Sequence, residues 1–291
     1  MILVIGESLV DVVGGEAVPG GSLANVAVAL ARLGADVRLL TGYGGDEHGR
    51  LLDEHLRGSG VGFAADPHVL PRTSTAVATL DESGAASYVF ELDGTLPALD
   101  PGLAPAHVHV GSIGALLEPG ADLVASSVER LRATATISYD LNVRPSAVPV
   151  DADRIEALAA RADLVKASDE DLLAWRPGST VEDSVAHLLS AGVAAVVLTL
   201  GSAGARCVTP AGTVDVPAER VAVVDTIGAG DTFAAATLDG LRLRGLLGNR
   251  DTLRALPLDL WSAVLRRAGR AAAITVSRHG ADPPTAAELD G

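Results

Sequence analysis

The chain has 291 residues, 48% of them hydrophobic, so it is long enough to bury a large core in one domain with at most a small addition. Lys and Arg number 22 against 37 Asp and Glu, which gives a formal net charge of −15 with no basic run. This balance argues against a nucleic-acid backbone or an anionic membrane as a partner.

Three further features point to a soluble cytoplasmic protein. The single cysteine, Cys207, allows neither an internal disulfide nor a cysteine-based metal cluster. No stretch approaches the roughly 18 uninterrupted apolar residues of a membrane span. Residues 1–15 lack a charged segment before their short apolar run, so we expect them to begin with a buried strand and not a signal peptide.

Short runs rich in Val, Ile and Leu alternate with helical patterns along most of the chain, which predicts strands joined by crossover helices into a mainly parallel sheet. The helix expected from Ser22 has a plausible serine cap and stops before Gly34. We expect strands at residues 2–5, 37–41, 135–139, 164–166 and 194–200, and helices near 22–33, 121–132, 151–161, 181–190, 229–244 and 258–274.

Two segments depart from this alternation. Residues 73–80 and 85–92 are rich in β-forming residues and are separated by the turn sequence at 81–84, so they are predicted to form a hairpin. Residues 9–18 form another short extended stretch. We expect these segments to make a small sheet beside the main one.

The sequence DTIGAGDTF at residues 225–233 opens a helix on glycines, with Asp231 in the first turn. A helix N-terminus presents unpaired N–H groups, and glycines let an anion approach them. A carboxylate beside such an anion is unfavourable unless it receives a proton or hydrogen bond from a hydroxyl group. The arrangement therefore suits phosphoryl transfer to an alcohol, although a capped helix after a tight turn is the alternative.

Four segments, in this order, resemble the ribokinase-like (PfkB) family of sugar and nucleoside kinases. They are residues 19–34, 41–49, 199–205 and 225–233, and the resemblance spans nearly the whole chain. It implies a three-layer α/β/α fold with a mainly parallel central sheet and a small β lid. The domain would comprise residues 1–291, with lid segments at about 9–18 and 72–92.

The resemblance also implies roles for individual residues. Asp231 matches the catalytic base, and Gly228, Ala229 and Gly230 match the anion hole that holds the transferred phosphoryl group. The sugar pocket would be formed by Asp11, Gly20, Gly21 and Asn25. The structural alternatives are that Asp11 caps a turn, that the two glycines form only a tight turn, and that Asn25 is a surface residue of the helix.

On the nucleotide side, Thr199, Gly201 and Gly204 resemble the strand end and loop beneath ATP, with a plain β-turn as the alternative. Ser168 and Asp171 stand where many relatives carry the Asn and Glu that place magnesium and phosphate. Both depart from that pattern, and Ser168 is equally suited to cap a helix.

Lys166 stands at a strand end where it is within reach of a phosphate, or it is a solvated edge residue. Asp225 and Ile227 match positions that bind a monovalent cation in several relatives, and Gly280 resembles the other side of that loop. ATP and Mg²⁺ are therefore the expected cofactors, with K⁺ as an additional candidate.

Sequences at the N-terminus (6–11), at 139–145 and near the C-terminus resemble the fructokinase branch, so a hexose, fructose first, is the expected acceptor. Arg144 is predicted to bind the sugar or phosphate, with a loop salt bridge as the alternative. Should it face a carboxylate, 2-keto-3-deoxygluconate becomes the acceptor. Ribokinase, nucleoside kinase and a catalytically silent sensor are the remaining alternatives, and a homodimer through the lid is expected.

Overall fold

The computed structural model describes residues 1–80 and 86–291, and for residues 78–80 and 86–88 it describes the backbone alone. The predicted turn at 81–84 lies outside the described residues.

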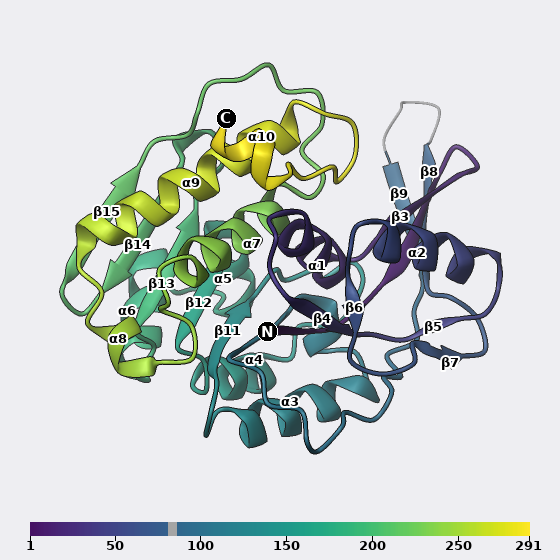
Figure 1. Cartoon of the computed structure of the whole chain (residues 1–291), viewed down its shortest axis with the longest axis horizontal. Helices are drawn as coiled ribbons and strands as arrows, with labels where there is room; N and C mark the ends of the chain where they lie inside the picture. The colour runs from purple at the N-terminus through teal and green to yellow at the C-terminus, as the bar shows by residue number, and fades with distance from the viewer. Residues whose placement is uncertain (81–85) are drawn as a thin grey trace.

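The central sheet has the strand order β15-β14-β13-β12-β11-β10-β1-β4-β6. The strands from β13 to β6 pair in parallel, and β14 and β15 add an antiparallel hairpin at one edge (Figure 1). Their bounds are β1 Ile2–Ile5, β4 Val37–Leu40, β6 Gly62–Phe63, β10 His107–Gly111, β11 Thr136–Asp140, β12 Leu164–Ser168, β13 Ala195–Thr199, β14 Ala205–Thr209 and β15 Gly212–Val216.

Helices cover both faces of this sheet. Their bounds are α1 Ser22–Arg32, α2 Glu47–Gly58, α3 Gly120–Leu131, α4 Ala152–Ala159, α5 Asp169–Trp175, α6 Val181–Ser190, α7 Ala229–Arg242, α8 Arg250–Arg254, α9 Leu258–Val276 and α10 Ala286–Asp290, with short 3₁₀ helices η1 Ile113–Ala115 and η2 Gly201–Ala203. The three-layer α/β/α fold is thereby confirmed. All six expected helices exist, and their ends lie within two residues of the predicted ones.

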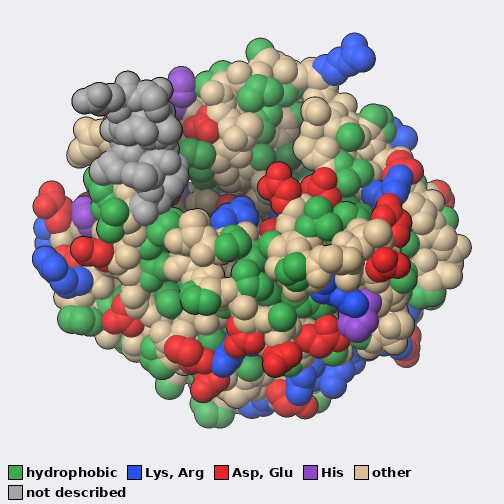
Figure 2. All heavy atoms as spheres, turned by 180° about the vertical axis from the view of Figure 1, so that it is seen from behind, with side chains coloured by type: hydrophobic (Ala, Val, Ile, Leu, Met, Phe, Trp, Pro, Cys, Tyr) green, Lys and Arg blue, Asp and Glu red, His purple; other side chains and the backbone are tan. Residues whose placement is uncertain are grey.

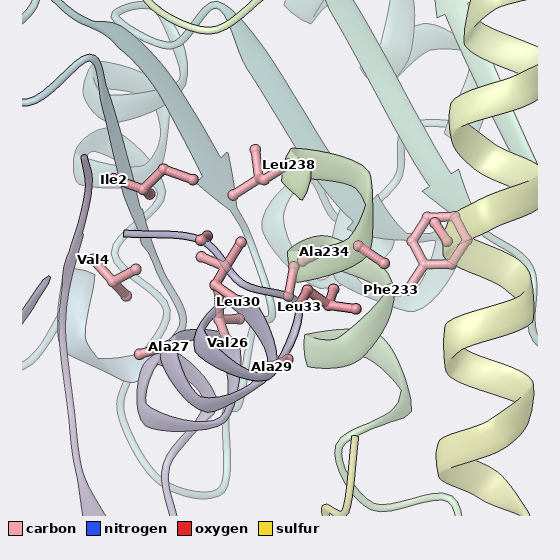
Figure 3. Close-up of a cluster of buried hydrophobic side chains, with 14 of the residues drawn as sticks. Ile2, Val4, Val26, Ala27, Ala29, Leu30, Leu33, Phe233, Ala234 and Leu238 are labelled. Atoms are coloured by element: carbon pink, nitrogen blue, oxygen red, sulfur yellow. The ribbon is translucent and has the colours of Figure 1, made fainter. Parts of the chain in front are cut away.

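Two hydrophobic cores result from the alternation of side chains along each strand. In β1, Ile2 and Val4 face the core beneath α1, α7 and α9, whereas Leu3 and Ile5 face the core beneath α3 to α6. Figure 3 shows the first core, with Leu30 of α1 next to α7 and the ring of Phe233 beside α9.

A separate four-stranded sheet, which we call the small sheet, has the order β3-β2-β8-β9. Its strands are β2 Leu9–Val13, β3 Glu16–Gly20, β8 Thr75–Leu80 and β9 Ala86–Glu91. The prediction of one extended stretch at 9–18 was wrong in detail, because Gly14 and Gly15 take φ values of 60° and 86° and turn the chain into a hairpin. A third sheet pairs β5 Tyr43–Gly44 with β7 His68–Leu70.

An ion cluster of Asp239, Arg242 and Arg267 connects α7 to α9. Asp239 of α7 is fully buried, and its Oδ1 accepts a hydrogen bond from Arg242 Nη2 at 2.7 Å. Its Oδ2 accepts one from Arg267 Nη2 of α9 at 3.1 Å. Both carboxylate oxygens are therefore paired inside the protein.

We expect Asp239→Ala to lower the free energy of unfolding by about 3 kcal/mol, because Arg242 and the largely buried Arg267 both lose their shared partner, although Arg267 keeps its pair with Asp290. Chemical denaturation monitored by circular dichroism measures this. The control is Arg206→Ala, which breaks the half-exposed Arg206–Asp215 pair of the β14–β15 hairpin and should cost at most about 1 kcal/mol. Equal losses in the two variants would contradict the prediction.

Candidate active site

The predicted site residues gather at the carboxyl ends of the parallel strands. Of these, Ser168 and Thr199 end β12 and β13. Gly6 and Glu7, which follow β1, and Asp140, which ends β11, lie at the same edge but were not predicted as site residues. From β1 the chain passes first to β4 on one side and later to β10 on the other, so the strand order reverses beside β1. In open α/β sheets, ligands bind in the crevice at such a reversal.

Helix α7 begins at this edge with its N-terminus open. Its N-cap is Gly228, which has a left-handed φ of 72°, and no described side chain caps the helix. A Cβ on Gly228 would lie 2.6 Å from Ala281 Cβ, so only glycine fits. The first-turn amides have no intrahelical acceptors and carry the positive end of the helix dipole.

Asp231 lies in the first turn of α7, as predicted, and α1 holds its carboxylate. Ser22 Oγ donates a hydrogen bond to Oδ1 at 2.7 Å, and Asn25 Nδ2 donates one to Oδ2 at 2.8 Å. The structure thus brings Asn25 to the proposed base. The N-cap of α1 is Gly21, not Ser22, so the cap expected at Ser22 was wrong and its hydroxyl contacts Asp231 instead.

Glu7, which was missing from the predicted site, helps to hold the start of α1 in place. Its Oε1 accepts a hydrogen bond from the Ser22 N–H, and its Oε2 accepts one from the Gly114 N–H, each at 2.9 Å. Burial raises the pKa of Glu7 to about 7. The hydrogen bonds from backbone N–H groups, including those of Gly114 and Ser22, partly offset this increase, and the nearby Asp231 charge adds a smaller one. The GE pair directly after the first strand was the only sequence signal.

The small sheet brings Asp11 to the same region. Burial raises the pKa of the Asp11 carboxyl. A Cβ on Gly20 would lie 2.2 Å from Asp11 Oδ2, and Gly21, at φ 100°, would place one 2.8 Å from the Glu7 carbonyl. These glycines are therefore required for close approach of the chain to the site. A neighbouring cavity is lined by Glu7, Leu9, Asp93, Ile113 and Gly114, among others.

Across the sheet edge, Ser168 and Asp171 form a capping box at the start of α5. Ser168 Oγ accepts from the Asp171 N–H at 3.0 Å, and Asp171 Oδ2 accepts from the Ser168 N–H at 2.8 Å. The capping interpretation of Ser168 is confirmed. The other Asp171 oxygen accepts from the Val143 N–H at 2.8 Å and lies 3.7 Å from Nη1 of Arg144, whose side chain is half exposed.

The loops expected on the nucleotide and cation sides also lie here. Gly201 and Gly204 follow β13 with φ values of 53° and 103°, and a Cβ on Gly204 would lie 2.1 Å from the Val216 carbonyl. Asp225 accepts hydrogen bonds from the N–H groups of Ile227, at 3.0 Å, and Gly280, at 2.9 Å. These bonds lower the pKa of Asp225 and join the two loops whose pairing the sequence suggested.

Figure 2 shows that this face of the molecule is hollowed near its centre, with acidic and basic side chains beside the hollow. Within residues 1–80 and 86–291, no cluster of three His, Cys, Asp or Glu side chains is arranged to bind a metal ion. Over the same residues, no helix is both long and apolar enough to span a bilayer.

We expect the free energy of unfolding of the wild type to fall relative to that of Glu7→Gln as the pH rises from 5 to 8. The folded state retains the Glu7 proton up to a pKa of about 7, whereas the unfolded state releases it near 4.5, so stability is lost across this window. The change should be about 2 kcal/mol, discounted for the remaining solvent contact of Glu7. Urea denaturation at each pH measures it, and parallel pH curves for the two proteins would contradict it.

Comparison with known proteins is consistent with this geometry. Residues 4–287 match the pfkB family of carbohydrate kinases. A fructokinase of Rhizobium leguminosarum bv. trifolii is 36% identical over 86% of this chain and 82% of its own, and a probable fructokinase-4 of Arabidopsis thaliana is 33% identical over 98% and 90%. The crystal structure of fructokinase with bound ATP from Xylella fastidiosa superposes with a TM-score of 0.86 at 27% identity, covering 99% of this chain and 96% of that one. The chain belongs to the pfkB family of carbohydrate kinases and is a phosphotransferase with an alcohol group as acceptor.

Proposed function

We propose that the protein transfers the γ-phosphoryl group of ATP to a primary hydroxyl group of a hexose, and that the hexose is fructose. The observation that carries the proposal is the Asp231 carboxylate, oriented by Ser22 and Asn25 in the first turn of the uncapped helix α7. The fructokinases of Rhizobium leguminosarum bv. trifolii and Klebsiella pneumoniae, 36% and 33% identical to this chain, support fructose as the acceptor.

In the proposed reaction, Asp231 accepts the proton of the sugar hydroxyl while the hydroxyl oxygen of the sugar attacks the γ-phosphorus. The bond between that phosphorus and the β–γ bridging oxygen breaks, and ADP leaves. The backbone N–H groups at residues 228–230 stabilise charge on the transferred group. Asp11 accepts hydrogen bonds from sugar hydroxyls, and the Asn25 side chain donates a hydrogen bond to Asp231 and thereby orients the base.

ATP, the phosphoryl donor, is proposed to bind above Thr199, Gly201 and Gly204. Ser168 and Asp171 are proposed to help to position its magnesium ion. Asp171 uses one lone pair of each oxygen for backbone N–H groups, so a pair on each remains for a metal-bound water. Magnesium bound with ATP would neutralise phosphate charge. Ile227, Asp225 and Gly280 frame the proposed potassium site, where backbone carbonyl oxygens and the remaining lone pair of each Asp225 oxygen are the available ligands.

Asp231→Asn should lower kcat by several orders of magnitude and leave ATP binding largely unchanged, because the amide keeps the shape but cannot accept the proton. A coupled ADP-release assay, with and without potassium, measures kcat, and isothermal titration measures ATP binding. Turnover equal to that of the wild type would remove Asp231 from the role of base. Asp259→Asn, which changes an exposed carboxylate in the first turn of α9 outside the proposed site, is the matched control and should leave kcat unchanged.

The same assay decides between acceptors. A second candidate, 2-keto-3-deoxygluconate, is favoured by Arg144, whose half-exposed guanidinium lies 3.7 Å from Asp171 and is available to a substrate carboxylate. The screen therefore includes fructose, 2-keto-3-deoxygluconate, ribose and adenosine. A silent sensor would bind one of these without ADP release.

We also propose that residues 1–291 form one kinase domain in which the small sheet is a lid over the sugar, and that the enzyme is cytoplasmic, where ATP is available. The small sheet exposes three valines, Val13, Val18 and Val89, at 49%, 41% and 57%. Val13 and Val18 share one face of the sheet, and Val89 lies on the other. Exposed apolar side chains on a sheet favour association with a second copy.

We expect the protein to dimerise through the small sheet, so that its mass by multi-angle light scattering is twice that of the chain. Val18→Asp should shift it toward the monomer, because the charge would be desolvated in the interface. Val223→Asp, at an exposed valine outside that sheet, is the control and should leave the mass unchanged. A monomeric wild type at micromolar concentration would exclude this interface.

A further inference from the structure

Lys166 is the only lysine of the chain; all other cationic side chains except histidine are arginines. It lies in β12, two residues before the strand ends, and its side chain is 10% exposed. Its Nζ donates a hydrogen bond to Asp140 Oδ2 of β11 at 2.8 Å. The alternative of a solvated edge residue is therefore wrong.

The ammonium packs against the first turn of α7. A Cβ built on Gly230 would lie 3.2 Å from Lys166 Nζ, so a larger residue at 230 would press on the ammonium. The positive charge consequently lies beside the positive end of the helix dipole, which is unfavourable unless an anion binds both. Asp140 supplies one negative charge, and its other oxygen is buried with no hydrogen-bond partner among the described residues.

The surroundings keep Lys166 charged. The Asp140 carboxylate pairs with its ammonium at 2.8 Å, and the carboxylates of Asp231 and Asp171 also attract it. On the sheet side, His109 is neutral at physiological pH, because burial lowers its pKa to about 3. The site therefore holds a permanent, nearly dehydrated cation beside the proposed anion hole.

We propose that Lys166 is a catalytic residue whose ammonium binds the transferred phosphoryl group together with the first-turn amides of α7. Its charge is unchanged through the reaction: no bond to Lys166 forms or breaks, and the hydroxyl proton still passes to Asp231. Asp140 acts as a positioning residue that holds the ammonium in place. The assignment rests on the proposed kinase reaction but not on the identity of the sugar.

The first test is kinetic. Lys166→Met should lower kcat about 100- to 1,000-fold, with the KM for the sugar within a few fold of wild type, because the charge acts on the phosphoryl group. Lys166→Arg should recover part of this loss. Arg250→Met is the matched control: it breaks the ion pair of a partly exposed arginine with the buried Asp163, which precedes the same strand β12, and should leave kcat unchanged. A folded Lys166→Met variant with kcat within threefold of wild type would overturn the assignment.

The second test does not depend on turnover or on the folding of a variant. Wild-type protein labelled with ¹³C at the lysine ε-carbon gives one lysine signal, because the chain has one lysine. Addition of the magnesium complex of the non-hydrolysable ATP analogue AMP-PNP should shift this signal, and ADP should shift it much less. Identical signals in both complexes would overturn the assignment. If the signal responds but no acceptor is phosphorylated, the proposed reaction fails while phosphate binding by Lys166 stands.

Discussion

The hydrogen bonds from Ser22 and Asn25 to the Asp231 carboxylate are the constraint on which the site depends. They join the first turns of α1 and α7, which are more than 200 residues apart in sequence but pack side by side over the same core (Figure 3). Because a carboxylate near a phosphate is repelled, it needs such donors to remain oriented. The packing of two helices therefore fixes the direction in which the proposed base points.

The hydrogen bonds of Glu7 hold the start of α1 in this position. Glu7, just after β1, accepts hydrogen bonds from the backbone of α1 at Ser22 and of η1 at Gly114. This side chain therefore connects β1, where the strand order reverses, to α1, which orients Asp231. Lys166 and Asp140 extend from the adjacent strands β12 and β11, and Lys166 reaches the first turn of α7. The carboxyl edge thus places one ammonium group among the carboxylates of Asp140, Asp231 and Asp171 beside an open helix end. Such preorganised charge is the usual source of catalysis in phosphoryl transfer.

Much of the fold could be predicted from periodicity, because buried strands are short apolar runs and the helices have amphipathic repeats. Helix α2 was missed, since its residues 47–58 are mostly charged and polar and its apolar face is limited to residues such as Leu52 and Leu56. The β14–β15 hairpin was missed as well, because β15 alternates between partly buried and exposed residues, buries only Val216 and has no long apolar run. Both elements are defined by tertiary contacts more than by local pattern.

For the site, the sequence by itself determined the chemistry: glycines opening α7, an acid in its first turn, and the motifs that identify a pfkB kinase. Local order fixes these, since Gly228 and Asp231 are three residues apart on one helix. Only the tertiary structure decided which side chains meet. Ser22 and Asn25 bind Asp231, Glu7 supports Ser22, and Lys166 packs on Gly230, because strands and helices distant in sequence converge at one edge of the sheet. No spacing along the chain encodes these distances.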